Sequence, residues 1–198
     1  MVELKPSLNF VGTKEGRFVF RRLDAHNPWD ISALNALLQN SLEYFLQNNG
    51  TPVRPDAAQK LFADMPSGKT EQDKFMMALF CDSEMLGFAD VMRGRPKPEI
   101  VVIRLFLISE KMQGKGLGTM MLAELGKLIT SWNCSDIELG VCVLNKRGIR
   151  FWRKEGFKEI RREQLPGYLD DIIVMRRMAS TKGKKTPSQL SICKTARK

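Results

Sequence analysis

The sequence predicts a single α/β domain with a mixed, largely antiparallel sheet. The chain has 198 residues, of which 43% are hydrophobic and 27% charged, and this composition suits a folded domain with its own core. Two β-rich segments, 74–81 and 84–92, flank a short turn and predict an antiparallel hairpin. A third β-rich segment, 99–108, runs into a glycine-rich stretch and then an amphipathic helix, an order typical of α/β proteins.

The N-terminal third predicts one strand and two helices. Residues 17–23 alternate loosely between apolar and polar and predict the first strand. Asn27, Pro28 and Asp30 combine an N-cap, an N1 proline and an acid in the first turn, so a helix begins there and extends to Asn49. Its apolar face consists of Ile31, Leu34, Leu38, Leu42 and Phe45. A shorter helix is expected from Asp56 to Met65.

The rest of the chain predicts a second run of alternating elements. The helix after the glycines extends to about Trp132, and Asn145 caps another helix that ends at Gly156. Three further segments have strand character: 136–143, 157–162 and 172–178. The expected domain therefore has six to seven strands flanked by about four helices.

The net charge of +10 is unevenly distributed along the chain, and this distribution separates a domain, 1–178, from a basic tail, 179–198. The tail has six Lys and Arg residues without an acid and reads as solvated and flexible, while the domain carries the remaining +4. We therefore expect nucleic acid to be no partner except through the tail. No segment has the ~20 apolar residues of a membrane span, and no signal-peptide core is visible, so the expected location is the cytoplasm without membrane association.

The cysteine and histidine content predicts no metal site. The four cysteines form no CxxC pair, and His26 is the only histidine, so a zinc site of the usual ligand spacing cannot be assembled. Reduced thiols are expected.

The glycine-rich stretch Gln113–Thr119 has the composition of an anion-binding loop. Three glycines in five residues permit positive φ angles, so that backbone amides can converge on an anion at the start of the following helix. Taken alone, this stretch also fits a tight strand-to-helix turn without a ligand.

Three motifs in register distinguish these readings. Gln113, Gly116 and Gly118 follow the strand end Phe106–Ile108, Asn145 comes about thirty residues later, and the segment Phe151–Phe157 ends in a Gly-Phe pair. Together with the order of elements over residues 17–178, this pattern resembles the GNAT superfamily of acyl-coenzyme A N-acyltransferases. The resemblance implies the GNAT-like sheet, acetyl-CoA as co-substrate and no metal.

The resemblance also implies roles for individual residues. The main chain of the strand end would bind the pantetheine arm, and one of its amides would polarise the thioester carbonyl. The glycine loop would hold the pyrophosphate with help from the Thr119 hydroxyl, and Asn145 would lie beside the pantetheine. The implied cofactor-binding residues are Phe106, Leu107, Ile108, Gln113, Gly114, Lys115, Gly116, Leu117, Gly118, Thr119, Asn145 and Trp152.

The sequence departs from the family where proton transfer is assigned. Many members have a Tyr at the position of Trp152, and an indole cannot serve as an acid near neutral pH. Tyr168, Tyr44, a water or no acid at all remain as alternatives. The two positions at which family members carry a Glu as general base are Val102 and Gly140 here. The base is therefore one of two other acids expected to face the acceptor cleft, or a chain of waters. These two candidate catalytic residues are Asp90 and Glu99.

The expected function is therefore an N-acetyltransferase in which a primary amine, on a small molecule or peptide, attacks acetyl-CoA directly in a ternary complex. Two alternatives belong to other classes: an acyl-CoA binding or sensing module without turnover, and a protein associated with nucleic acid through its tail. Both a monomer and a homodimer remain open.

Overall fold

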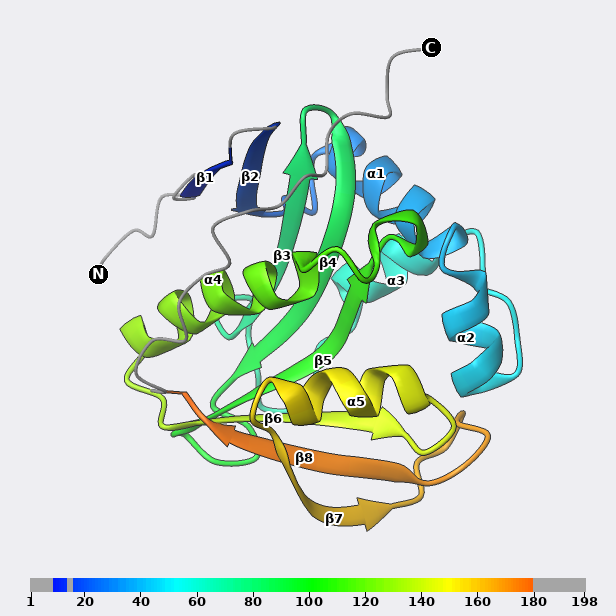
Figure 1. Ribbon diagram of the computed structural model, residues 1–198, viewed down its shortest axis with the longest axis vertical. Helices are drawn as coiled ribbons and strands as arrows, with labels where there is room; N and C mark the ends of the chain where they lie inside the picture. Colours follow the sequence, from blue (N-terminus) through cyan, green and yellow to red (C-terminus); the bar gives the residue numbers. More distant parts are fainter. Residues whose placement is uncertain (1–8, 14–15, 180–198) are drawn as a thin grey trace.

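The fold is built on one twisted eight-stranded sheet (Figure 1). The computed structural model describes residues 9–13 and 16–179, and the predicted tail therefore lies almost wholly outside the described residues. The strand order is β1-β2-β3-β4-β5-β6-β8-β7, with β5 and β6 parallel and all other neighbours antiparallel. The strands are β1 (Asn9–Thr13), β2 (Gly16–Arg22), β3 (Lys74–Cys81), β4 (Glu84–Arg93), β5 (Ile100–Ile108), β6 (Asp136–Cys142), β7 (Lys158–Glu163) and β8 (Ile172–Met178).

Helices cover both faces of the sheet. The helices are α1 (Pro28–Gln39), α2 (Leu42–Asn49), α3 (Ala57–Ala63), α4 (Leu117–Ser131) and α5 (Lys146–Lys154), with a 3-10 turn at Glu110–Met112. Figure 1 shows α4 and α5 in front of the sheet and α1, α2 and α3 on its other side. No helix within the described ranges is long and apolar enough to cross a membrane.

Each face has its own hydrophobic core. Residues of α4 and α5, among them Met121, Leu125 and Trp152, pack on one face of the strands. Leu34 and Leu38 of α1 pack on the other face against Phe88 of β4. Because side chains of a strand alternate between faces, the long apolar runs of β3, β4 and β5 supply both cores, as expected for strands covered on both sides.

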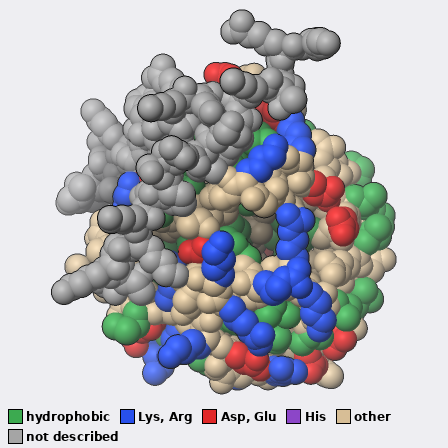
Figure 2. All heavy atoms as spheres, viewed as in Figure 1, with side chains coloured by type: hydrophobic (Ala, Val, Ile, Leu, Met, Phe, Trp, Pro, Cys, Tyr) green, Lys and Arg blue, Asp and Glu red, His purple; other side chains and the backbone are tan. Residues whose placement is uncertain are grey.

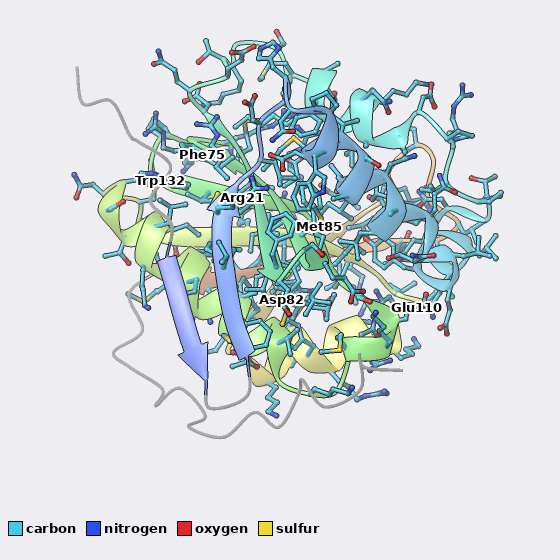
Figure 3. The ribbon with its side chains drawn as sticks, turned by 90° about the horizontal axis from the view of Figure 1, so that it is seen from above. Arg21, Phe75, Asp82, Met85, Glu110 and Trp132 are labelled. Atoms are coloured by element: carbon cyan, nitrogen blue, oxygen red, sulfur yellow. The ribbon has the colours of Figure 1, made fainter. Side chains whose placement is uncertain are left out.

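Helix α4 spans the molecule from the glycine loop to an aromatic contact at its far end. Trp132, its C-cap residue, packs against Phe75 of β3 in a tilted arrangement with ring centroids 4.2 Å apart. In Figure 3, Glu110, just before the glycine loop, and Trp132 lie on opposite sides of the view. The glycine loop therefore lies at one end of α4, and the Trp132–Phe75 contact lies at the other.

The predicted α/β fold is confirmed, with two local differences. Strand β1 extends the sheet beyond the predicted first strand. The single helix expected over 28–49 is two helices, because the buried Ser41 interrupts it: its hydroxyl donates to the Leu37 carbonyl at 2.8 Å and its amide donates to the Leu38 carbonyl. This break turns α2 away from the direction of α1.

Strands β5 and β6 separate after a short parallel contact. Their pairing runs only from Ile100 opposite Asp136 to Ile103 opposite Leu139, although both strands continue. On its other side, β5 pairs with β4 through a β-bulge, in which Asp90 opposes Leu105 and Val91 opposes Ile103, so that Arg104 is the extra residue. Within the described sheet, the separation leaves main-chain groups of β5 without a partner strand on one side.

Candidate active site

A cleft of about 400 Å³ opens where β5 and β6 separate. Its walls come from the end of β5, the glycine loop, the end of β6 and the start of α5, with α2 and the β7–β8 loop at the other end. Figure 2 shows a hollow on this face with Lys and Arg side chains around it. The cofactor half is defined here as the glycine loop, α5 and the β5 end, and the acceptor half as α2, the β6 end and the β7–β8 loop.

The glycine loop has the geometry of an anion cradle. Gly114 and Gly116 adopt φ angles of +78° and +84°, which L side chains rarely take. Gly116 is the N-cap of α4, and no side chain in the described part of the protein caps that helix, so its first-turn amides and the positive end of its dipole remain available to a ligand. A pyrophosphate group fits this arrangement.

Gln113 and Gly118 hold the glycine loop against the end of β5 and against α5. The side-chain amide of Gln113 donates to the Ile108 carbonyl at 2.9 Å and ties the loop to the end of β5. A Cβ at Gly118 would lie 3.1 Å from the Phe151 ring, so a larger residue there would push α5 away. Gln113 and Gly118 therefore set the width of the cofactor half.

The Thr119 hydroxyl has a different partner from the predicted phosphate. It donates to the Glu155 carboxylate at 2.6 Å, and Glu155 is only 7% exposed. This bond links the start of α4 to the end of α5. Because a hydroxyl has one proton to donate, Thr119 has none left for a phosphate. Thr119 still borders the cleft, where its oxygen is available only as an acceptor.

Helix α5 supplies the second wall of the cofactor half. Asn145 caps it by accepting a hydrogen bond from the Gly148 amide at 2.7 Å. Trp152 is buried and packs edge-on against Phe106, Phe151 and Phe157, with centroid distances of 5.1, 4.8 and 5.1 Å. The indole is therefore part of an aromatic support beneath the cleft.

The structure brings most of the predicted cofactor residues together. Two do not line the cleft with their side chains: Lys115 is exposed, and Leu117 is buried in the core beneath α4. The predicted residues that do line the cleft are Phe106, Leu107, Ile108, Gln113, Gly114, Gly116, Gly118, Thr119, Asn145 and Trp152.

Two tyrosines from distant parts of the chain meet in the acceptor half. Tyr44 of α2 and Tyr168 of the β7–β8 loop both line the cleft together with Cys142 at the end of β6. Burial is the main cause that raises the pKa of Tyr44, followed by the neighbouring Tyr168 and Cys142. Tyr168 is only partly buried, and this partial burial is the main cause that raises its pKa, while Arg104 acts in the opposite direction. Both phenols therefore stay protonated at neutral pH and can donate a hydrogen bond or a proton.

Three hydrogen bonds join α2 to the β6–α5 loop and the β7–β8 loop around the acceptor half. We call this set of hydrogen bonds the α2 bridge. The Gln47 side chain donates to the Leu144 carbonyl at 2.7 Å, and the Asn49 side chain donates to the Gly167 carbonyl at 2.8 Å. The Leu169 amide donates to the Asn48 carbonyl at 2.9 Å. These hydrogen bonds join segments more than 90 residues apart in the sequence.

The structure corrects the expectation that Asp90 and Glu99 face the cleft. Glu99 is exposed just before β5, about 30 Å of extended strand away from Ile108. Asp90 is fully buried behind the bulge, and burial raises its pKa. Neither of its carboxylate oxygens has a hydrogen-bond partner among the described residues, and Oδ2 lies 3.7 Å from Arg104 Nε. Neither acid lines the cleft.

Several cleft residues escaped prediction. Glu43 of α2 and Glu110 line the cleft as carboxylates, and Arg104 lines it from the bulge while it pairs with Asp64. The sequence pattern around Glu43 predicts only an exposed position on a helix, so it gives no indication that Glu43 lines the cleft. Across the described residues, no group of three or more His, Cys, Asp or Glu side chains is placed to hold a metal ion.

Comparisons with known proteins agree with this geometry. The model of the acetyltransferase (GNAT) family matches residues 35–157. A comparison with curated proteins finds no match. Among solved structures, an acetyltransferase from Thermus thermophilus is 20% identical, with 86% of this chain and 99% of that chain covered and a TM-score of 0.67.

Two further structures share the fold at similar distance. The ribosomal-protein-S18-alanine N-acetyltransferase from Escherichia coli is 19% identical, with 84% of this chain and 97% of that chain covered and a TM-score of 0.61. The PaiA N-acetyltransferase from Thermoplasma acidophilum, solved in complex with coenzyme A, is 16% identical, with 81% and 98% covered and a TM-score of 0.60. With the family model matched over more than half of the chain and a cleft of this construction, the chain belongs to the GNAT acetyltransferase family.

Proposed function

We propose that the protein is an N-acetyltransferase that moves an acetyl group from acetyl-CoA to a primary amine by direct attack in a ternary complex. The observation that carries the proposal is the cleft at the separation of β5 and β6, because it is continuous from the glycine loop to the two tyrosines. Such a cleft holds a donor in one half and an acceptor in the other without a covalent intermediate.

The cofactor half supplies binding and polarisation. The amides of the glycine loop and α4 hold the pyrophosphate, and the main chain of Phe106–Ile108, which β6 does not pair, holds the pantetheine arm and faces the carbonyl. Acetyl-CoA supplies the thioester: the acceptor nitrogen bonds to the acetyl carbon as the carbon–sulfur bond breaks, and coenzyme A leaves as a thiol.

The acceptor half supplies proton transfer. Glu43 is the cleft carboxylate on α2 and takes the amine proton, directly or through water. Tyr168, whose phenol is protonated at neutral pH, donates a proton to the departing sulfur; Tyr44 is the second candidate for this role. Asp90, buried beside Arg104, has a structural role in this scheme.

The test is release of coenzyme A thiol from acetyl-CoA in the presence of a panel of primary amines, amino acids and short peptides. We expect release with at least one class of amine. Glu43→Gln and Tyr168→Phe should each lower kcat roughly 10- to 100-fold with unchanged acetyl-CoA affinity. Glu84→Gln, an exposed carboxylate on the β3–β4 hairpin, is the matched control and should have no effect.

Two results would contradict the proposal in different ways. A rise in melting temperature with acetyl-CoA but no thiol release with any amine would favour an acyl-CoA binding or sensing module. No effect of acetyl-CoA on the melting temperature would remove both readings.

A further inference from the structure

Exposed leucines gather around the outer edge of the acceptor half. Of the nine large hydrophobic side chains that are exposed in the described part of the chain, five are leucines of α2, the β6–α5 loop and the β7–β8 loop. Each of the five is between 36% and 58% exposed, and none of them lines the cleft. We name this set the leucine rim: Leu42, Leu46, Leu144, Leu165 and Leu169.

The α2 bridge brings the three segments of the leucine rim together. It joins α2 to the two loops at the Leu144 carbonyl and at the Leu169 amide. The Leu169 side chain also lies against Gly50 at the end of α2, where a Cβ would approach it to 2.9 Å. Leu42 and Leu46 are one helical turn apart and lie on the same side of α2. The rim therefore follows one edge of the molecule, where α2 adjoins the loops after β6 and before β8 (Figure 1).

The leucine rim continues the acceptor half outward. Glu43, Asn145 and Tyr168 line the cleft, and each of them is next to a rim leucine in the sequence. A small amine held inside the cleft leaves the rim in water, whereas a polypeptide that brings its amine into the cleft also covers the rim. A group of exposed leucines beside a cleft marks a surface for interaction.

The same three segments carry only negative charge. Helix α2 and the two loops contain Glu43, Asp170 and Asp171 and no Lys or Arg. Asp170 is exposed and forms no ion pair with a described residue, whereas Arg162 of β7 interacts electrostatically with Asp171. Figure 2 shows acidic and hydrophobic side chains next to each other along the edge of the molecule where α2 lies.

The two halves of the cleft therefore differ in charge. Lys146 and Arg147, at the start of α5, line the cleft on the cofactor side. The negative phosphates of a bound cofactor offset these cations and leave the acids of the acceptor side as the charge that an incoming acceptor meets. A partner with positive charge complements this side.

We propose that the acceptor is a polypeptide whose residues next to the acetylated amine are apolar and basic, and that these residues dock on the leucine rim. This inference rests on the proposed function, because it identifies the class of acceptor for the same cleft. Apolar side chains of the acceptor cover the leucines, and its Lys or Arg side chains pair with Asp170. Glu43 remains with the amine inside the cleft.

Charge disfavours two other occupants of the leucine rim. In a two-fold contact between copies of this chain, Asp170 and Asp171 of both copies would share one interface to which these segments supply no cation. A membrane surface with anionic lipids repels the same two acids. A basic polypeptide meets neither obstacle.

The first test compares acceptors, with the full chain, acetyl-CoA and release of coenzyme A thiol as the readout. The reference is a short amidated peptide of Ala, Leu and Arg, whose only amine is its N-terminus. One matched peptide has Ser in place of Leu, another has Glu in place of Arg, and alanine amide presents the amine alone. A second series has a blocked N-terminus and a single Lys as its only amine.

We expect the reference peptide to exceed alanine amide roughly 100-fold in kcat/KM, mainly through a lower KM, because two or more of its leucines become buried. Each matched peptide should lose roughly 10-fold relative to the reference. A value of kcat/KM for alanine amide equal to that of every peptide would overturn the proposal.

Paired variants locate the surface. Leu46→Ser with Leu165→Ser should raise KM for the reference peptide roughly 10-fold, while acetyl-CoA affinity, which also reports correct folding, stays unchanged. The matched control is Ile160→Ser with Met178→Ser, which removes two exposed hydrophobic side chains outside the rim. An equal loss in the control pair would assign the effect to surface hydrophobicity in general and overturn the proposal.

A charge swap tests the acidic end of the rim. Asp170→Lys should lower kcat/KM for the reference peptide roughly 10-fold and raise it for the Glu-containing peptide by a similar factor. Glu99→Lys is the matched control at an exposed position outside the cleft and should change neither value. Loss for both peptides with Asp170→Lys would contradict the pairing of a basic residue with Asp170.

Binding measured apart from turnover separates this inference from the proposed function. Anisotropy follows the reference peptide, labelled at its C-terminus, with coenzyme A present. Binding that weakens with the Leu46 and Leu165 pair, without thiol release from any amine, would support the docking surface and contradict the enzyme. A wild-type dimer that the same pair converts to a monomer, with peptide binding unchanged, would instead assign the rim to a second copy of the chain.

Discussion

The cofactor half and the acceptor half of the cleft are built by different physical means. In the cofactor half, main-chain amides of the glycine loop, a helix N-terminus and an aromatic cluster form the site, and each of its parts is marked by a short local motif. In the acceptor half, side chains of α2, β6 and the β7–β8 loop meet through hydrogen bonds between distant segments. The first half depends on backbone conformation and the second on tertiary packing.

This difference has consequences for specificity. A backbone cradle binds any ligand with the right phosphate group, so its sequence can be short and general. A wall of side chains on helices and loops can change its chemistry at each position. Variants should therefore affect the binding of the donor and of the acceptor separately.

The largest effect is expected for Gly116→Glu in the cofactor half. The variant places a carboxylate at a φ of +84° beside the proposed pyrophosphate site, and like-charge repulsion should weaken acetyl-CoA binding roughly 100-fold or more. Calorimetry would measure the affinity. Gly126→Glu is the matched control, because a Cβ there has no described neighbour within 4 Å, and unchanged affinity in both variants would refute the placement of the pyrophosphate.

A smaller effect, confined to binding of the acceptor amine, is expected when the side-chain hydrogen bonds of the α2 bridge are removed. Gln47→Ala with Asn49→Ala removes two hydrogen bonds of about 1 kcal/mol each and should raise KM for the amine roughly 10-fold. The acetyl-CoA affinity should not change. Gln39→Ala removes a comparable side-chain bond to the Arg54 carbonyl outside the cleft and should be neutral. An equal loss of acetyl-CoA affinity would mean that the two halves are not independent.

The smallest effect on binding is expected for Thr119→Val. This change leaves the buried Glu155 carboxylate without its hydroxyl donor, at a cost of about 1–3 kcal/mol of folding stability. The melting temperature should fall by about 2–12 °C, and acetyl-CoA affinity should change less than about threefold. Thr119→Ser should restore stability. A large loss of affinity without loss of stability would return Thr119 to its predicted phosphate role.

The cofactor half and most of the fold were predictable from the sequence for a physical reason. The cap at Asn27, the glycines of the loop and the cap at Asn145 are local signals whose effect depends on neighbours within a few residues. The break at Ser41 was harder to predict, because the apolar spacing continues from α1 through Leu42 and Phe45 while a side chain-to-backbone bond interrupts the helix.

The acceptor half could not be predicted in the same way. Asp90 and Glu99 were inferred from strand position alone, but the bulge at Arg104 buries Asp90, and strand length separates Glu99 from the cleft. Tyr44 and Tyr168 were among the candidate acids named from the sequence, whereas Glu43 was not. All three line the cleft because α2 turns at Ser41 and joins the β7–β8 loop. Their positions depend on contacts across more than 100 residues.

The α/β class, the glycine cradle and the division of net charge between domain and tail could all be predicted, since each follows from local composition and spacing. Three features depend instead on the tertiary structure: which carboxylate enters the cleft, which group accepts the Thr119 hydrogen bond, and the contact between the end of β8 and the end of α5. Side-chain partners are set by packing between distant segments, and no local pattern encodes that packing.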